Sequence, residues 1–178
     1  MAQFKETFDV LMELEGGYDN DPYDAGGETK YGITAPRLKK AKSLGVAGGK
    51  TIKSLGIRDA EAIWFHTLWK PQKYVWFESQ DLATKVFQLA AVMGPRQAHK
   101  ELQRAINTLG TWNLKIDGRI GPQTRRAIPP KTDILELLLT AHAQGFFRLI
   151  THVPTEKQIV QYAKNKKYIK GWMNRSMK

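Results

Sequence analysis

Apolar residues recur at helical spacing along most of this chain, and glycine or proline interrupts the pattern between runs. Gly16-Gly17 is expected to end the helix over residues 3–14, Pro71 the helix over residues 59–69, and Gly94-Pro95 the helix over residues 80–93. Asp133 is the expected N-cap of a long run near the end. The pattern predicts a mainly α fold, with helices over residues 3–14, 35–42, 59–69, 80–93, 96–109, 123–128, 133–151 and 156–173.

Residues 18–34 break this pattern, because they are dense in Asp, Asn, Gly, Pro and Tyr. Such residues favour tight turns, so we expect a small irregular or β insert here instead of a helix. No internal repeat or low-complexity linker divides the chain, whose 178 residues suit one compact unit or two small subdomains that share a core.

The charge balance indicates an affinity for polyanions. Lys and Arg number 28 and Asp and Glu number 17, so the net charge is +11, which favours nucleic acid, acidic lipid or a bacterial envelope as a partner. The chain has no cysteine, which excludes disulfides and thiolate metal sites. Its most apolar segment, residues 134–153, is interrupted by charged and polar side chains and is expected to form a buried helix.

Glu15 is the strongest candidate for chemistry. It lies in the last turn of the first predicted helix, with apolar neighbours one turn earlier and two glycines after it. A carboxyl held against apolar side chains is partly desolvated, so it stays protonated near neutral pH, as a general acid for glycosidic cleavage must. The turns that follow offer Asp21 or Asp24 as a second carboxylate and Thr29 as a hydroxyl that positions water.

The same loop carries groups that suit a polymer. Tyr18, Tyr23 and Tyr31 offer flat faces for sugar rings, Thr34 adds a hydroxyl, and the glycines let a chain approach the backbone closely. Two other interpretations stay open for this stretch, a Gly/Asp-rich structural loop and a calcium-binding loop. The spacing of its acids does not match the EF-hand pattern, and no bidentate Glu closes it.

One ordered run of residues carries a family resemblance. It comprises Glu15-Gly16-Gly17-Tyr18, Asn20-Asp21-Pro22, Asp24 and Gly26-Gly27-Glu28-Thr29-Lys30-Tyr31-Gly32-Ile33-Thr34. This run resembles the signature of the glycoside hydrolase family 108 muramidases, which include phage endolysins and secretion-associated muramidases. Later segments are also similar to that family, so the resemblance covers nearly the whole chain: Leu68-Trp69-Lys70-Pro71, Leu102-Gln103-Arg104-Ala105, residues 116–124 and residues 170–175.

The resemblance implies a lysozyme-like helical fold, with a muramidase catalytic region over residues 1–94 and a helical peptidoglycan-binding region over residues 95–178, packed as one unit. It implies a lysozyme-type glycosidase that cleaves the β-1,4 bond between N-acetylmuramic acid and N-acetylglucosamine, with Glu15 as the acid. A second similarity, to phage-type lysozymes, implies catalytic roles for Asp24 and Thr29. We expect the substrate to be contacted by Tyr18, Tyr31, Thr34, Trp69 and Gln88.

One helix departs from the family pattern. The family has Phe-Asp-x-Ala-Val-Asn-x-Gly where this chain has residues 87–94, so Gln88 and Val92 replace an acid and an amide. Two interpretations of this departure stay open: altered or lost cleavage in a relative that only binds peptidoglycan, and a simple packing role for position 92. A lytic transglycosylase, in which the muramyl hydroxyl attacks within the substrate, is a further alternative.

The remaining features predict no cofactor and no metal site, because the four histidines at 66, 99, 142 and 152 lack the paired spacing of metal ligands. Lysines and aromatic residues alternate from Lys164 to Lys178, which suits a docked last helix or attraction to an anionic envelope surface. Nucleic-acid binding rests on charge alone. The start of the chain lacks a secretory signal, so we expect a bacteriolytic monomer that is made in the bacterial cytoplasm and reaches the periplasmic wall through a holin or a dedicated secretion route.

Overall fold

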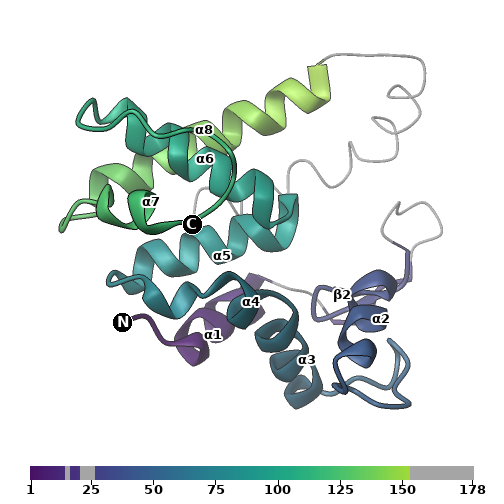
Figure 1. Ribbon diagram of the computed structural model, residues 1–178. Helices are drawn as coiled ribbons and strands as arrows, with labels where there is room; N and C mark the ends of the chain where they lie inside the picture. Colours follow the sequence, from purple (N-terminus) through teal and green to yellow (C-terminus); the bar gives the residue numbers. More distant parts are fainter. Residues whose placement is uncertain (15–16, 21–26, 153–178) are drawn as a thin grey trace.

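The computed structural model describes residues 1–14, 17–20 and 27–152. Within them, helices form most of the fold and a short hairpin lies at one side beside α2, so the prediction of a mainly α fold with a small β insert near residues 18–34 is confirmed (Figure 1). The elements are α1 (Phe4–Leu14), β1 (Thr29–Lys30), β2 (Ile33–Thr34), α2 (Ala35–Ser43), α3 (Ile57–Trp64), the π-helix η1 (Phe65–Trp69), α4 (Lys70–Gln72), the 3-10 helix η2 (Tyr74–Trp76), α5 (Gln80–Met93), α6 (Pro95–Thr108), α7 (Pro122–Arg126) and α8 (Asp133–His152).

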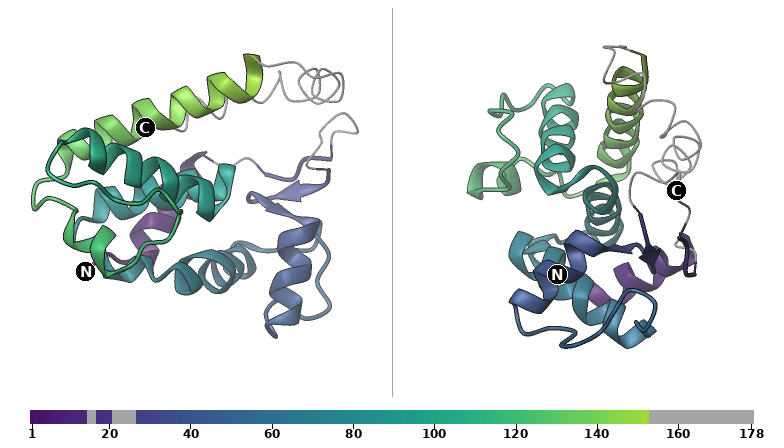
Figure 2. Two further views of the ribbon diagram at one scale, coloured as in Figure 1. Left: turned by 45° about the horizontal axis from the view of Figure 1, so that its top comes forward. Right: turned by 90° about the vertical axis from the view of Figure 1, so that its right-hand side faces the viewer.

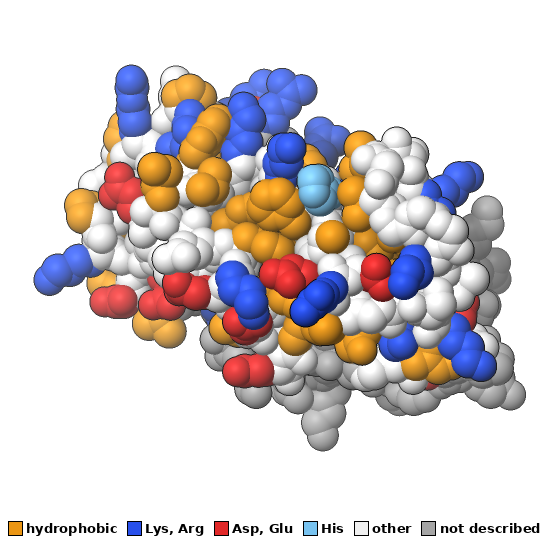
Figure 3. Space-filling view, turned by 90° about the horizontal axis from the view of Figure 1, so that it is seen from below, with side chains coloured by type: hydrophobic (Ala, Val, Ile, Leu, Met, Phe, Trp, Pro, Cys, Tyr) orange, Lys and Arg blue, Asp and Glu red, His pale blue; other side chains and the backbone are white. Residues whose placement is uncertain are grey.

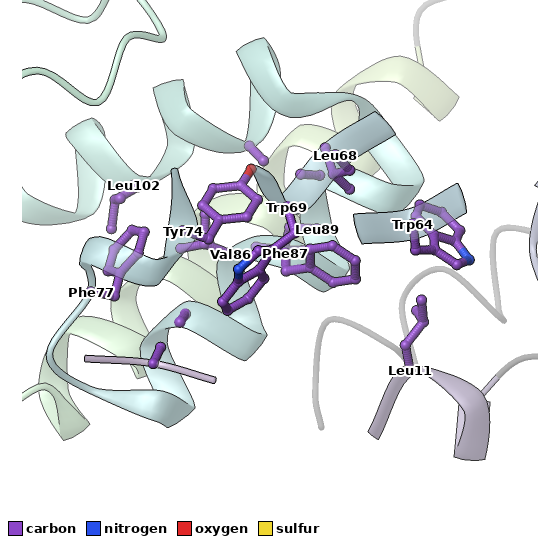
Figure 4. Close-up of a cluster of buried hydrophobic side chains, with 14 of the residues drawn as sticks. Leu11, Trp64, Leu68, Trp69, Tyr74, Phe77, Val86, Phe87, Leu89 and Leu102 are labelled. Atoms are coloured by element: carbon purple, nitrogen blue, oxygen red, sulfur yellow. The ribbon is translucent and has the colours of Figure 1, made fainter. Parts of the chain in front are cut away.

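Helix α5 lies at the centre of the fold and contacts α1, α6, α8, η1 and η2. Its side chains are buried on nearly every face, as expected for a helix that other elements surround. The Phe87 ring packs within 6.1 Å, between ring centroids, of four other aromatic rings. These rings belong to Phe4, Trp64, Trp69 and Tyr74, and Figure 4 shows the last three around Phe87. The core therefore joins α1, α3, η1, η2 and α5.

The two ends of α5 follow the signals in its sequence. The Ser79 hydroxyl accepts a hydrogen bond from Leu82 N at 3.1 Å and so caps the first turn. Gly94 ends the helix with φ 82°, a backbone angle that favours glycine, and Pro95 begins α6 directly after it. The predicted break at Gly94-Pro95 is confirmed, and it sends α6 back to pack between α5 and α8 (Figure 2).

The predicted end at Pro71 of the helix over residues 59–69 is wrong. Helix α3 passes into η1 and then into α4, which includes Pro71 and ends at Gln72. A proline has no N–H to donate to the carbonyl four residues earlier, which here belongs to Thr67. Lys40 Nζ, from α2, donates to that carbonyl at 2.9 Å. This tertiary contact supplies the hydrogen bond that the proline cannot, and the chain turns only at Lys73, with φ 57°.

The last described helix begins one residue differently from the prediction. Glu136 N donates to the Thr132 carbonyl at 2.8 Å, so Thr132 takes the N-cap position that was expected for Asp133. The Thr132 hydroxyl also donates to the Glu136 carboxylate at 2.7 Å, which closes the first turn of α8.

Of the helices within the described ranges, none is long and apolar enough to span a lipid bilayer. On the face shown in Figure 3, lysine and arginine side chains alternate with acidic ones across the middle, and further lysine and arginine side chains lie along the upper edge. The predicted helix over residues 156–173 and the basic segment from Lys164 to Lys178 lie outside the described residues.

Candidate active site

The hairpin that follows α1 carries a row of polar side chains on one face. Strands β1 and β2 pair antiparallel with Thr29 opposite Thr34, and Asp19 pairs with Thr29 on the other edge of β1. Two backbone hydrogen bonds, of 2.8 and 2.9 Å, join Asp19 to Thr29. Because directly opposed residues project from one face of a sheet, Asp19, Thr29 and Thr34 form a row, which we call the polar row.

The opposite face of the hairpin packs on the core. Ile33, which pairs with Lys30 on that face, is fully buried among the core residues. The polar row therefore faces away from the core, with Asp19 exposed and Thr29 and Thr34 half-buried. Hydroxyl and carboxylate groups placed in this way can meet a ligand and hold a water molecule beside it.

A two-residue turn fixes the register of the polar row. Tyr31 and Gly32 occupy the turn with φ 53° and φ 70°, the two positive angles that a tight hairpin turn requires. The buried Trp64 side chain donates from Nε1 to the Tyr31 carbonyl at 3.0 Å and ties the turn to α3. Arg37 stacks on the Trp64 ring, with Cζ 3.8 Å from the ring centroid. Helices α2 and α3 therefore position the hairpin.

Tyr18 stands at the edge of this small sheet with 43% of its surface exposed. Its hydroxyl donates to Glu28 Oε1 at 3.0 Å. This hydrogen bond to the Glu28 carboxylate raises the pKa of the Tyr18 phenol. The hydroxyl is thus engaged within the protein, whereas the exposed ring face is available to a ligand.

Of the predicted site residues, Tyr18, Thr29, Tyr31 and Thr34 come together in and around the hairpin. Glu15 and Asp24, the predicted acid and second carboxylate, lie outside the described residues. In the chain, Glu15 comes directly after α1 and four residues before Asp19.

Trp69 does not lie at this site. Its side chain is 3% exposed, and its ring packs 5.5 Å from Phe4 and 5.8 Å from Tyr74, between ring centroids. The expectation that Trp69 contacts substrate is therefore corrected to a packing role. The Trp-x-Pro spacing carries no signal of burial, which depends on α1 and η2 closing over the ring.

Gln88 is also buried, with 3% of its surface exposed, and it lies on α5 facing α1 and α8. A pocket of about 310 Å³ lies there, lined also by Lys85, Glu136 and Val10. Gln88 Nε2 has no hydrogen-bond partner among the described residues. Gln88, one of the two residues that depart from the family pattern, thus lies between α1, α5 and α8 and lines this pocket.

Two residues of the site were not identified from the sequence, Asp19 as part of the polar row and Glu28 as the partner of Tyr18. Period-two alternation beside the Tyr31-Gly32 turn would have placed Glu28 and Thr29 on opposite faces. The pairing of Asp19 across a loop has no comparable local signal. Within the described ranges, no three His, Cys, Asp or Glu side chains gather closely enough to hold a metal ion.

Comparison with known proteins gives two family matches. Residues 8–94 match the family described as "Glycosyl hydrolase 108", and residues 97–177 match the "Predicted Peptidoglycan domain". The fold is similar to the solved structure of Brucella abortus SagA, with a TM-score of 0.70 and 21% sequence identity over 98% of this chain and 93% of that one. No curated protein matches the chain. The structural likeness supports the predicted lysozyme-like helical fold.

Proposed function

We propose that this chain, whose residues 8–94 match the glycosyl hydrolase 108 family and whose residues 97–177 match a peptidoglycan domain, cleaves one particular bond of peptidoglycan. A peptidoglycan hydrolase follows from the two families together. Our proposal is finer: the bond is the β-1,4 linkage between N-acetylmuramic acid and N-acetylglucosamine, and Glu15 is the general acid.

The observation that carries the proposal is the order of groups within the matched region. Glu15 follows the amphipathic helix α1, and the hairpin after it presents Thr29 in a polar row that faces away from the core. Hydrolysis of a glycosidic bond needs a carboxylic acid that protonates the leaving oxygen, a second carboxylate, and a group that positions the attacking water.

In the proposed reaction, Glu15 donates its proton to the glycosidic oxygen as the bond from that oxygen to the sugar C1 breaks. Positive charge develops on the sugar ring, and Asp24 stabilises it electrostatically. Thr29 holds the water that attacks C1, and the Asp24 carboxylate accepts the proton that this water loses. The exposed ring of Tyr18 supports a sugar beside the reacting bond.

The test is product analysis on purified murein with Glu15→Gln as the variant. Wild type should release fragments with N-acetylmuramic acid at the reducing end, and Glu15→Gln should release none at the same concentration. Glu13→Gln is the matched control, since Glu13 is an exposed acid of α1 two residues earlier, and it should cut like wild type.

Three results would redirect the proposal. Products that end in 1,6-anhydro sugars would assign the chain to the lytic transglycosylases. Binding to murein without any cleavage would assign it to the non-catalytic relatives. Cleavage by Glu15→Gln at the wild-type rate would show that another group is the acid.

A further inference from the structure

A pocket lies at the far end of the molecule from the hairpin, between η2 and α7. It has a volume of about 570 Å³, within the range of small-ligand sites. Ser79, the N-cap of α5, lines this pocket, whereas the hairpin is tied to Trp64, which packs on Phe87 further along α5. Figures 1 and 2 show α7 and β2 on opposite sides of the fold. The pocket is therefore separate from the candidate active site.

The two family regions contribute one wall each. Residues 73–79 of the glycosyl hydrolase region face residues 120–132 of the peptidoglycan-binding region. Pro129 and Pro130 are among the latter and restrict the backbone of that wall. A ligand in this pocket would touch both regions at once.

Two cations lie close to the Trp76 ring at this pocket. Lys73 Nζ is 4.4 Å from the centroid of the Trp76 ring, and Arg125 Cζ is 4.0 Å from it. Trp76 remains 40% exposed, so part of this large apolar side chain faces solvent. Lys73 adopts φ 57°, an angle that is unfavourable for a side chain with a Cβ.

The charge of the pocket is positive. Within the described ranges, Lys73, Arg125 and Arg126 line it together with one acid, Glu78. Arg125 Nε is buried without a hydrogen-bond partner in the described part of the chain. Among the described residues the Arg125 guanidinium forms no ion pair, and it lies over the Trp76 ring. A carboxylate is the natural partner for a guanidinium in such a position.

We propose that this pocket binds the carboxylate-bearing peptide stem of peptidoglycan, an inference that rests on the proposed function only for the identity of the polymer. In intact murein the lactyl carboxyl of the muramyl sugar forms the amide bond to the peptide and therefore carries no charge. The remaining negative charges therefore sit on the peptide stems, and their aliphatic parts suit the Trp76 ring and the proline wall. The glycan lies at the hairpin, and a stem lies at the opposite end of α5.

The test is a titration of the isotope-labelled full chain with a soluble stem tripeptide that contains D-glutamate and diaminopimelate. The indole N–H signal of Trp76, identified by its loss in Trp76→Phe, should shift and saturate. Arg125→Gln should weaken binding about tenfold, as expected for the loss of a charge-assisted contact. Lys73→Gly should weaken it similarly without harming the fold, because glycine adopts φ 57° readily.

Arg58→Gln is the matched control, since Arg58 is an exposed cation on α3 away from the pocket, and it should bind like wild type. The same tripeptide with amidated carboxyls should bind at least tenfold more weakly. No saturable shift, or equal binding by wild type and both pocket variants, would overturn the proposal. Equal affinity for inorganic phosphate would also overturn it, because the site would then be a general anion site.

The outcome separates this proposal from the proposed function. A protein that cuts murein but shows no stem binding at Trp76 contradicts the pocket alone. A protein that binds the stem but cuts nothing contradicts the Glu15 mechanism alone.

Discussion

The Tyr74 hydroxyl lies 2.8 Å from His99 Nε2, and this buried contact joins η2 of the hydrolase region to α6 of the peptidoglycan-binding region. His99 Nδ1 lies 3.1 Å from the Gly118 carbonyl, which can only accept. Nδ1 therefore carries the proton, and in the neutral ring Nε2 accepts from Tyr74. Three segments that are distant in sequence meet at this one imidazole.

This contact predicts a loss of stability in acid. Burial lowers the pKa of His99 from 6.5 to about 4. Below pH 6.5 the His99 side chain of the unfolded chain binds a proton, whereas in the folded protein it stays neutral. The free energy of unfolding therefore falls as the pH drops towards 4. At about 1.4 kcal/mol per pKa unit, the loss approaches about 3 kcal/mol.

Denaturant unfolding of wild type and His99→Gln at pH 7.5, 6, 5 and 4 measures this effect. Gln carries a donor and an acceptor but does not titrate in this range, so the free energy of unfolding should fall less steeply with acid in the variant. His66→Gln serves as the control, because His66 is only half-buried. Equal slopes for wild type and His99→Gln would contradict the prediction.

A second prediction on stability concerns Gly118, where the chain passes close to α6. A Cβ added there would lie 2.4 Å from the Arg96 carbonyl oxygen, and φ is 76°. Gly118→Ala should therefore lower the free energy of unfolding by about 3 kcal/mol or more. Gly110→Ala is the matched comparison, with φ 79° but open space around the new Cβ, and should cost about 1 kcal/mol. Thermal melts measure the stability of both variants. Equal losses of stability would show that backbone strain alone, and not the contact with Arg96, causes the effect.

Local signals in the sequence predicted the elements that depend on local chemistry. The apolar spacing of residues 3–14 and the break at Gly94-Pro95 each act within one or two turns, and both are found in the structure. The helix that continues through Pro71 was missed because Lys40, whose ammonium satisfies the Thr67 carbonyl, lies 27 residues away in sequence. No local rule includes such a donor.

In the candidate site, too, local sequence predicted some features, whereas others depend on residues from distant elements. A glycine after Tyr31 permits a two-residue turn, and that turn alone places Thr29 opposite Thr34. Trp69 was misjudged because a tryptophan in a helix serves equally for packing or for sugar stacking. Only the rings of Phe4 and Tyr74, brought in from other elements, decide that it is buried.

The polar row predicts different kinetic effects for its two threonines. Thr29→Val keeps the branched shape that suits a strand but removes the hydroxyl, so kcat on murein should fall at least about tenfold, as for the loss of a group that positions water. Thr29→Ser keeps a hydroxyl and should recover most of the rate. Thr34→Val should raise KM more than it lowers kcat, since Thr34 is expected to touch bound substrate.

Turbidity of purified murein suspensions gives these rates, and circular dichroism checks that each variant stays folded. A folded Thr29→Val enzyme with wild-type kcat would remove Thr29 from the reaction. A fall in kcat that Thr29→Ser fails to recover would point to packing of the hairpin as the cause.

The contacts of Tyr18 predict that its ring contributes more to substrate binding than its hydroxyl. The hydroxyl is already bound to Glu28, so a ligand gains chiefly from the exposed ring. Tyr18→Ala should therefore raise KM about tenfold, in line with truncation of an aromatic contact, and Tyr18→Phe should raise it far less. Glu28→Gln should also lower the pKa of the Tyr18 phenol, because the carboxylate that favours its protonated form is gone. Steady-state kinetics and tyrosine NMR titration measure the two effects. If Tyr18→Phe raises KM as much as Tyr18→Ala does, the hydroxyl must leave Glu28 and bind the substrate itself.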